Sequence, residues 1–350
     1  MSLVLTLFLV SFGIWILLSW EDILTRKKEI SLFILTCLVL LVVAEAVSYI
    51  IIPPKPISRY GWQPEANSEV NWNMPHINGT KKRVLIKYYD YGFKRWGDIN
   101  SNKSKILVIG DSFTEMFYVS NGQEYYSYLE KAFPGYEFFV YGASGYGTLQ
   151  EYMVLNDTFD LIKPDIILWQ FCGNDFINNL HSYESKVFLN NNRVYRPYFE
   201  NGNIIYKKPR PLWWLRKYSR FFAFVLEKYD NIFFEKNVIA EREGKIKSYY
   251  PEEQKKSLKI TEEIFRLVKD KTLNTPILLF EACFNTLEYN TLCSDFNLTC
   301  DYGLREHLQN KEKEGYYLTT VFDGHWNEAG NKLVGEYLVN YLKNNTFLIR

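Results

Sequence analysis

Apolar residues dominate the first fifty-two positions of the chain more completely than any later segment of that length. Residues 3–20 contain no charged side chain, and residues 30–52 contain only Glu45. Each stretch approaches the ~20 apolar residues that are needed to cross a bilayer. The pattern therefore predicts that residues 1–52 form an anchor of two membrane-spanning helices.

The loop between these stretches, residues 21–29, contains Arg26, Lys27 and Lys28. The positive-inside rule places such a loop in the cytoplasm and the rest of the chain across the membrane. A cleavable secretory signal is the alternative, because Ala44-Glu45-Ala46 resembles a cleavage site, but such a signal would hardly need the extra span before it. Glu45 lies near the outer end of its span, where it can reach interfacial water; a functional acid inside the membrane is the other interpretation.

Beyond the anchor, short apolar runs replace the long ones. Residues 53–104 begin with Pro53-Pro54-Lys55-Pro56 and are rich in Gly, Asn, Trp and Tyr, so we expect a stiff linker and an irregular or β-rich lead-in. About 300 residues follow the anchor, which is enough for one large domain with a substantial core. We place this domain at residues 105–350.

Within residues 105–350, apolar runs alternate with helix-like stretches. The runs predict strands at Lys105–Ile109, Glu137–Tyr141, Asp165–Phe171 and Pro276–Ala282. The stretches predict helices at Gln123–Phe133, Gln150–Phe159 and Glu252–Lys269, and a last one with an apolar face from Ala329 to Leu342. Strands that are apolar on both faces and alternate with helices indicate an α/β fold with a parallel sheet covered on two sides. Ligands of such sheets bind at the carboxyl ends of the strands.

A long insertion, residues 176–250, separates the third and fourth predicted strands. It gathers aromatic side chains in a short stretch, namely Trp213, Trp214, Tyr218, Phe221, Phe222 and Phe224. These could form a platform that stacks on sugar rings, or an amphipathic helix that packs onto the domain or the membrane surface. In either case the insertion is a candidate cap over the site.

The composition excludes several classes of partner. The formal net charge is +1, so the chain has no basic footprint for nucleic acid. It contains no H-E-x-x-H, no P-loop, no dinucleotide fingerprint and no C-x-x-C pair, and we expect neither a metal nor another cofactor. Among the five cysteines, the spacing of Cys293 and Cys300 suggests a disulfide in an extracytoplasmic compartment.

The first predicted strand ends in Gly110-Asp111-Ser112, with a helix expected directly behind it. A serine at such a turn is held at the edge of the sheet, near free N–H groups of the helix start that can stabilise an oxyanion. Ser112 is therefore a candidate nucleophile, although serine is also a favoured helix N-cap.

Two further loops lie at the same predicted edge of the sheet. Val140–Thr148 follows the second strand and contains three glycines, where a backbone can approach a ligand closely. Gly173-Asn174-Asp175 follows the third strand, where the Asn174 amide is either a turn former or an oxyanion donor.

A base that takes the serine proton has to be one of four histidines, and only His325 has a carboxylate, Asp323, two residues before it in a turn entering the last helix. Asp323 could orient the imidazole of His325 and stabilise its cationic form. A surface turn histidine is the alternative.

Together these blocks resemble, in order and setting, the SGNH (GDSL-type) hydrolases, a superfamily of esterases and acyltransferases. The resemblance spans residues 105–343 and implies a three-layer α/β/α, flavodoxin-like fold. It makes Ser112 the nucleophile, His325 the general base and Asp323 its partner. The oxyanion hole would consist of the N–H groups of Ser112 and Gly145, with Gly142 as an alternative to Gly145, and the Asn174 amide.

One residue, Gly324, separates the acid from the histidine, whereas the family usually has two. Asp-x-His-Trp is similar to the pair in SGNH-like proteins that O-acetylate alginate, although their motifs run in another order. A Ser/His dyad is therefore an alternative to a Ser/His/Asp triad.

The resemblance implies a membrane-anchored serine esterase that removes acetyl or other acyl groups from cell-envelope carbohydrate, facing the periplasm or exterior of a bacterium. Two alternatives stay open. One is an O-acyltransferase that acetylates a surface polysaccharide and takes its acyl group from a membrane partner; the other is a non-catalytic carbohydrate-binding or assembly subunit. The sequence does not identify the acyl donor, the acceptor or the oligomeric state.

Overall fold

The computed structural model describes residues 27–51, 58–75, 81–190, 195–207, 215, 218–283, 287–296, 298–320 and 324–345. The first predicted span, residues 3–20, lies outside this part of the chain. The chain divides into two compact units: residues 1–56 with 210–246, and residues 57–209 with 247–350. The predicted insertion, residues 176–250, therefore contributes to both units.

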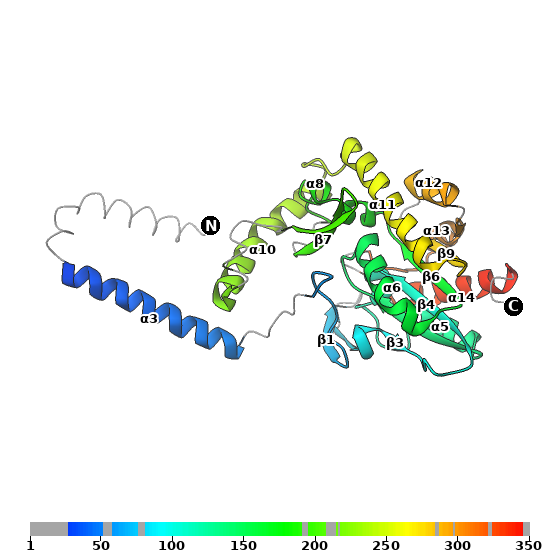
Figure 1. The fold of residues 1–350 in the computed structure, drawn as a ribbon, viewed down its shortest axis with the longest axis horizontal. Helices are drawn as coiled ribbons and strands as arrows, with labels where there is room; N and C mark the ends of the chain where they lie inside the picture. The colour runs from blue at the N-terminus through cyan, green and yellow to red at the C-terminus, as the bar shows by residue number, and fades with distance from the viewer. Residues whose placement is uncertain are drawn as a thin grey trace. The chain divides into compact units, whose positions relative to one another are not determined.

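The larger unit is built on a six-stranded sheet (Figure 1). The strands lie in the order β10-β9-β6-β4-β5-β3, and all neighbours are parallel except β3 and β5. Numbered along the chain, the five parallel strands have the flavodoxin-like order 2-1-3-4-5 read from the β5 side, so the predicted fold class is confirmed. The antiparallel strand at the β5 edge departs from a purely parallel sheet. The bounds are β3 Arg95–Trp96, β4 Ser104–Gly110, β5 Tyr136–Gly142, β6 Ile166–Phe171, β9 Ile277–Glu281 and β10 Thr299–Cys300.

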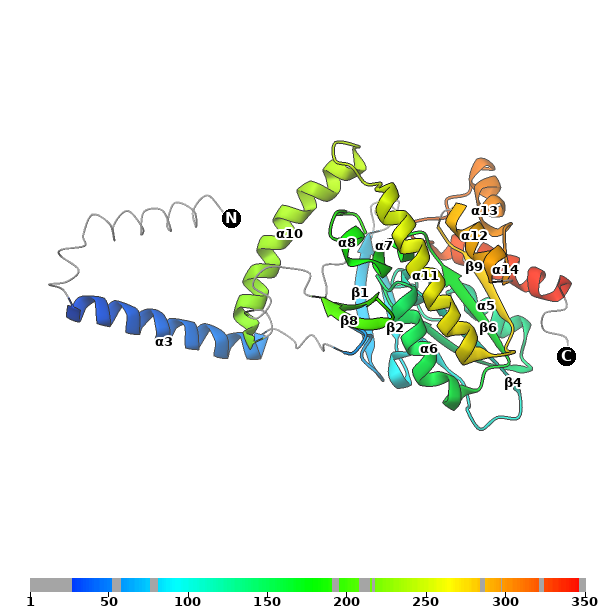
Figure 2. The same cartoon turned by 45° about the horizontal axis from the view of Figure 1, so that its top comes forward.

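Helices cover both faces of this sheet because alternate strand residues point to opposite sides (Figure 2). Ile106 and Val108 of β4 belong to a core shared with α5, α13 and α14, whereas Leu107 and Ile109 belong to one shared with α6, α11 and α12. The result is the three-layer arrangement predicted from the strand pattern. The helices are α5 Tyr125–Ala132, α6 Thr148–Ile162, α11 Pro251–Thr272, α12 Leu287–Asp295, α13 Leu304–Lys313 and α14 Glu328–Asn344.

Shorter elements surround the carboxyl edge of the sheet. The lead-in is β-rich as predicted, because β1 and β2 pair as an antiparallel hairpin before the 3-10 helix η1 and β3. The insertion supplies two short helices and a second antiparallel hairpin to this unit. The bounds are β1 Glu69–Pro75, β2 Lys81–Lys87, η1 Asp90–Gly92, α4 Ser112–Glu115, α7 Asn174–Asn179, α8 His181–Glu184, β7 Arg196–Glu200 and β8 Asn203–Lys207.

Two disulfides join segments of the larger unit. Cys293 and Cys300 are bonded, which confirms the pair suggested by their spacing. Cys172 and Cys283 are also bonded, with Cα atoms 5.1 Å apart across 111 residues of sequence. Because they follow the neighbouring strands β6 and β9, this second bond depends on the sheet order, which no local pattern reveals.

The smaller unit contains two long helices, α3 (Lys27–Ile51) and α10 (Arg220–Arg242), that contact each other. Residues 28–51 are long and apolar enough to cross a membrane, and none of their most apolar window is buried by protein. Within the described residues this is the one such helix. It has the features of a membrane anchor or of a signal sequence.

A buried acid sits inside the larger unit, between α6 and β6. Glu151 accepts a hydrogen bond from Trp169 Nε1 at 2.6 Å, and both side chains are fully buried. Burial raises the pKa of the Glu151 carboxyl well above its ordinary value, and the nearby Asp111 carboxyl adds to this shift. The folded chain therefore retains a proton that the unfolded chain releases near the ordinary pKa.

We expect Glu151→Gln to stabilise the protein at alkaline pH. Above the ordinary carboxyl pKa the folded state binds more protons than the unfolded state, so the free energy of unfolding falls as pH rises towards the raised pKa. A glutamine can still accept the Trp169 bond but does not titrate. The Tm of the full chain in detergent should exceed that of the wild type at pH 8 by a few degrees, and the difference should shrink at pH 4. The exposed Glu263→Gln serves as control; identical pH profiles for Glu151→Gln and wild type would contradict the interpretation.

Candidate active site

Ser112 lies where β4 ends and the short helix α4 begins. Asp111 is the N-cap of α4, and its side-chain Oδ1 accepts a hydrogen bond from the Phe113 N–H at 2.9 Å. The half-buried Ser112 is thus the first residue of the helix and not its cap. The capping role belongs to its neighbour Asp111. The turn holds the hydroxyl at the carboxyl edge of the sheet, as predicted.

Two glycines allow the backbone to make this turn in a crowded place. A Cβ on Gly110 would lie 2.5 Å from Thr114 Oγ1, and one on Gly142 would lie 2.2 Å from the Glu115 backbone nitrogen. Gly142, the alternative oxyanion residue, thus lets α4 pack directly on the end of β5. Gly145, further along the same loop, has a φ of +75° and lies partly exposed.

His325 approaches Ser112 from the far end of the chain. Its Nε2 lies 2.7 Å from Ser112 Oγ, a hydrogen bond across 213 residues. The Thr320 N–H donates to the His325 carbonyl at 2.7 Å, and Thr319 forms a β-bridge with Trp326. The backbone on either side of the imidazole is therefore held, and the predicted pair of serine and histidine meets.

Aromatic rings fix the orientation of the imidazole. The Phe113 ring stacks on His325 with centroids 4.6 Å apart and an interplanar angle of 28°, and the Tyr118 ring lies 4.9 Å away. Trp326 is buried and packs edge-on against Phe113 at 4.9 Å. Because Phe113 follows Ser112 directly, the residue next to the serine also positions its partner. Sequence reasoning did not foresee these contacts.

Asp323, the predicted partner of His325, lies outside the described residues. Gly324, which separates them, has a φ of +84°, a conformation that favours glycine. The choice between a triad and a dyad therefore stays a prediction.

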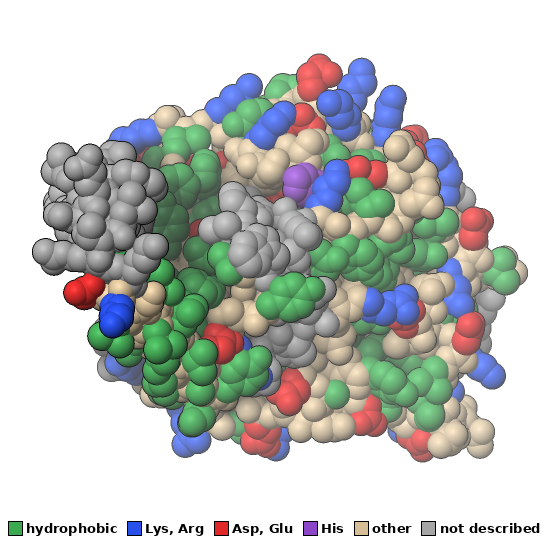
Figure 3. Space-filling model, turned by 60° about the vertical axis from the view of Figure 1, so that its left-hand side comes forward, with side chains coloured by type: hydrophobic (Ala, Val, Ile, Leu, Met, Phe, Trp, Pro, Cys, Tyr) green, Lys and Arg blue, Asp and Glu red, His purple; other side chains and the backbone are tan. Residues whose placement is uncertain are grey.

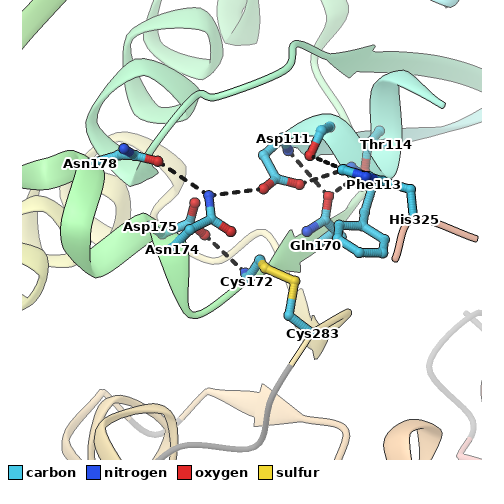
Figure 4. Close-up of a disulfide and its surroundings, with 11 residues drawn as sticks. Asp111, Phe113, Thr114, Gln170, Cys172, Asn174, Asp175, Asn178, Cys283 and His325 are labelled. Carbon is cyan, nitrogen blue, oxygen red and sulfur yellow. Dashed lines mark hydrogen bonds between the residues drawn. A yellow bond between two sulfur atoms is a disulfide. The ribbon is translucent and has the colours of Figure 1, made fainter. Parts of the chain in front are cut away.

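Asn174 begins α7, at the same edge of the sheet (Figure 4). Its Nδ2 donates to Asp111 Oδ2 at 3.3 Å and to Asn178 Oδ1 at 3.2 Å. Asp175 Oδ2 accepts from the Cys172 N–H at 3.0 Å, and the disulfide to Cys283 lies directly beneath this turn. The Asn174 amide is therefore held on both sides, adjacent to the residue that precedes the serine.

Asp111 ties the serine turn to the asparagine turn. Its backbone N–H donates to Gln170 Oε1 at 3.1 Å, while its carboxylate receives the Phe113 N–H and the Asn174 amide. Burial raises the pKa of the Asp111 carboxyl, and these hydrogen bonds and the nearby His325 act in the opposite direction. The buried acid thus organises two of the predicted site residues without facing solvent.

Glu115 anchors the glycine-rich loop. Its Oε2 accepts from the Ser144 N–H at 2.7 Å and from the Ser144 hydroxyl, and its Oε1 accepts from Tyr88 Oη at 2.6 Å. Trp62 Nε1 donates to the Ser144 carbonyl at 3.0 Å. The residue before Gly145 is therefore bonded on both sides of its backbone. The role of Glu115 could not be predicted from the sequence, because nothing in its position along the chain indicates a bond to Ser144.

The arrangement suits transfer of an acyl group. An imidazole nitrogen within hydrogen-bond distance of a serine hydroxyl can take its proton as the hydroxyl attacks a carbonyl carbon. The N–H groups at the start of α4, the Gly145 loop and the Asn174 amide share one edge of the sheet with that hydroxyl. Such donors can stabilise the negative charge of a tetrahedral intermediate.

Residues 106–338 match the family model described as GDSL-like Lipase/Acylhydrolase. The match covers well over half of the chain, so the protein belongs to this family of ester-hydrolysing enzymes. The resemblance inferred from the four sequence blocks is thereby confirmed. No curated protein matches the chain significantly.

The solved structures that the chain matches are distant in sequence. A member of the lipolytic G-D-S-L family from Veillonella parvula is 12% identical, with a TM-score of 0.39 and coverage of 69% of this chain and 98% of that one. A lipase/acylhydrolase from Enterococcus faecalis is 12% identical, with a TM-score of 0.38 and coverage of 69% and 96%. A Clostridium thermocellum family 3 carbohydrate esterase is 14% identical, with a TM-score of 0.34 and coverage of 69% and 96%. These similarities carry no information on the substrate of this chain.

We expect Glu115→Gln to lower kcat with little effect on KM for a small ester. The amide keeps the volume of the side chain but loses the carboxylate that receives both Ser144 donors, so the Gly145 loop is less firmly positioned. The loss should be about tenfold to a hundredfold, less than the removal of an oxyanion donor itself. Tyr88→Phe, which removes only the bond to the other oxygen, should cost less. Equal kcat values for Glu115→Gln and wild type would show that the loop needs no such anchor.

Proposed function

We propose that the protein is a membrane-anchored serine esterase that removes acyl groups, chiefly acetyl, from cell-envelope carbohydrate. The observation that carries the enzymatic part is the 2.7 Å hydrogen bond between Ser112 Oγ and His325 Nε2. Family membership supports ester hydrolysis as the reaction class. The substrate, the anchoring and the residue roles below belong to the proposal.

In the first half of the reaction, Ser112 attacks the ester carbonyl carbon while His325 Nε2 takes its proton. The N–H groups of Ser112 and Gly145 and the Asn174 amide stabilise the oxyanion; Asn174 exchanges its long bond to Asp111 for the substrate oxygen. The tetrahedral intermediate collapses as His325 returns the proton to the leaving sugar hydroxyl, which leaves an acyl-serine. Water, activated by the same imidazole, then attacks and releases the acid. In the triad mechanism, Asp323 supports the imidazolium formed in each half.

A half-exposed aromatic cluster beside His325 supports a carbohydrate substrate. Trp72 of β1 stacks on Phe117 with centroids 5.1 Å apart, and it meets Tyr118 edge-on at 6.0 Å. Tyr118 in turn lies against the His325 imidazole. Aromatic rings combine a flat apolar surface with a polar edge, which suits the apolar faces of sugar rings. We call Trp72, Phe117 and Tyr118 the aromatic platform.

Helix α3 supports the membrane anchor. Its apolar stretch is long enough to cross a bilayer, and its most apolar window is not buried within the described residues. Residues 27 and 28 at its start are lysines, which favours a cytoplasmic start and an extracytoplasmic catalytic unit. The two disulfides are consistent with an oxidising compartment.

We expect Ser112→Ala and His325→Ala each to lower kcat for p-nitrophenyl acetate by about 10⁴-fold or more, because the nucleophile and the base act as one unit. A fluorophosphonate probe should label wild-type protein at Ser112 and fail to label Ser112→Ala. Asp323→Asn discriminates between the two mechanisms: a loss similar to that of His325→Ala indicates a triad, and a far smaller loss indicates a dyad. Wild-type protein that neither hydrolyses the ester nor reacts with the probe would rule out the proposed function.

We expect Trp72→Ala to raise KM for an acetylated polysaccharide by about fivefold to thirtyfold, since truncation of an aromatic contact typically costs about 1–2 kcal/mol. Hydrolysis of p-nitrophenyl acetate, which has no sugar ring to stack on Trp72, should change much less. Tyr316→Ala removes an exposed aromatic ring in the turn that follows α13, and this variant serves as the control. Equal changes of KM for both substrates would show that Trp72 acts through the fold and not through a sugar.

A further inference from the structure

Glu45 is the single acidic residue within the apolar stretch of α3, and the structure shows what it binds. Its Oε1 accepts from the Arg220 N–H at 2.8 Å, and its Oε2 accepts from the Phe221 N–H at 3.1 Å and from Ser219 Oγ at 2.5 Å. Ser219 is itself the N-cap of α10, with its Oγ accepting from the Phe222 N–H at 3.0 Å. The carboxylate therefore satisfies donors at the start of α10 that the helix cannot satisfy itself.

A second contact joins the same two helices. The Arg220 guanidinium lies 4.0 Å from the centre of the Tyr49 ring, and its Nη1 donates to the Tyr49 carbonyl at 3.2 Å. Glu45 and Tyr49 are one helical turn apart on α3, so both contacts lie on one side of that helix. The acid predicted to lie near interfacial water also joins α3 to α10.

These contacts set the distance, measured along α3, between the start of α10 and the outer end of the membrane span. Glu45 precedes Ile51 by six residues, which at 1.5 Å per residue is about 9 Å along the helix. When the apolar stretch of α3 crosses a bilayer, the first turn of α10 then lies near the boundary between the outer acyl chains and the headgroups. Any apolar surface on α10 begins next to lipid.

Helix α10 does present such a surface. Apolar side chains recur along one face at a helical spacing and are 40–64% exposed: Val225, Tyr229, Ile232, Phe233 and Ile239. Glu227 and Asn231 lie on the other side of the helix, whereas Glu235 borders the apolar face, three residues after Ile232 and four before Ile239. Lys236 falls within the apolar face, where a long side chain can extend its ammonium group to water. We call these five apolar residues the apolar face of α10. Figure 3 shows that hydrophobic side chains, in green, also gather on one side of the molecule.

We propose that α3 and α10 form one membrane-bound helix pair, in which Glu45 caps α10 and the apolar face of α10 lies at the outer boundary between lipid headgroups and acyl chains. The bilayer is the occupant that the contacts favour, because α10 is bonded to a helix whose most apolar window is not buried within the described residues. An amphipathic helix with aromatic and aliphatic residues on one side is suited to the interface plane. The inference rests on the anchoring part of the proposed function, and it assigns a role to α10, which lies within the insertion.

The test places spin labels on the full chain in phosphatidylcholine/phosphatidylglycerol vesicles. On a Cys37→Ala background, Phe233→Cys reports on the apolar face and Asn231→Cys on the opposite face, about 200° around the helix. We expect the label at 233 to be accessible to oxygen and shielded from an aqueous nickel complex, and the label at 231 to show the reverse order. Equal nickel accessibility at both positions would overturn the proposal. Shielding of position 233 from both reagents would also overturn it, and would indicate coverage by the catalytic unit or by a second copy.

Variants of Glu45 test the cap. Glu45→Leu should make the label at 233 accessible to the nickel complex, whereas Glu45→Gln, which keeps an acceptor oxygen, should preserve much of the shielding. An unchanged label in Glu45→Leu would show that α10 does not need the cap. Hydrolysis of p-nitrophenyl acetate by the same samples separates the outcomes, because none of these residues touches Ser112 or His325. Loss of membrane shielding with full activity refutes the helix pair alone, and lack of activity with shielding intact refutes the esterase alone.

Discussion

The hydrogen bond between Ser112 and His325 depends on a parallel sheet that no single segment of the chain can form. Ser112 follows the central strand β4, and His325 precedes the last helix, α14, which packs on one face of that sheet through α5 and the core they share. Tyr125 at the start of α5 donates its N–H to Asn331 Oδ1, so the two helices are also joined by a buried bond. The distance between nucleophile and base is thus a consequence of how α5 and α14 pack.

Around that pair, buried carboxylates perform the positioning and do not face the substrate. Asp111 connects the serine turn to the Asn174 turn, and Glu115 connects α4 to the Gly145 loop. Both are almost fully buried and both receive backbone N–H donors. A buried acid is costly unless it is hydrogen-bonded. Each therefore requires that the neighbouring loop keep one conformation, which is what an oxyanion site needs before the substrate arrives.

Elements with a strong local pattern were predictable from the sequence. The strands β4, β5, β6 and β9 and the helices α6, α11 and α14 follow from apolar periodicity, and their order indicates which loops share an edge. The features that could not be predicted depend on neighbours in space: the bond of Cys172 to Cys283, the antiparallel β3, and the partners of Glu115. Glu45 shows the same limit, because its position near the end of a span does not reveal its bonds to the start of α10. The role of Asp323 rests on sequence alone.

The bond between Cys172 and Cys283 has a consequence for the insertion. All of residues 176–250 lie between the two cysteines, so the bond closes a covalent ring of which the insertion is a part. A proteolytic cut anywhere within the insertion would leave the two halves of the chain joined at the sheet, directly under the Asn174 turn. The insertion is thus a loop within this covalent ring. Its length and composition can change while β6 and β9 stay covalently linked.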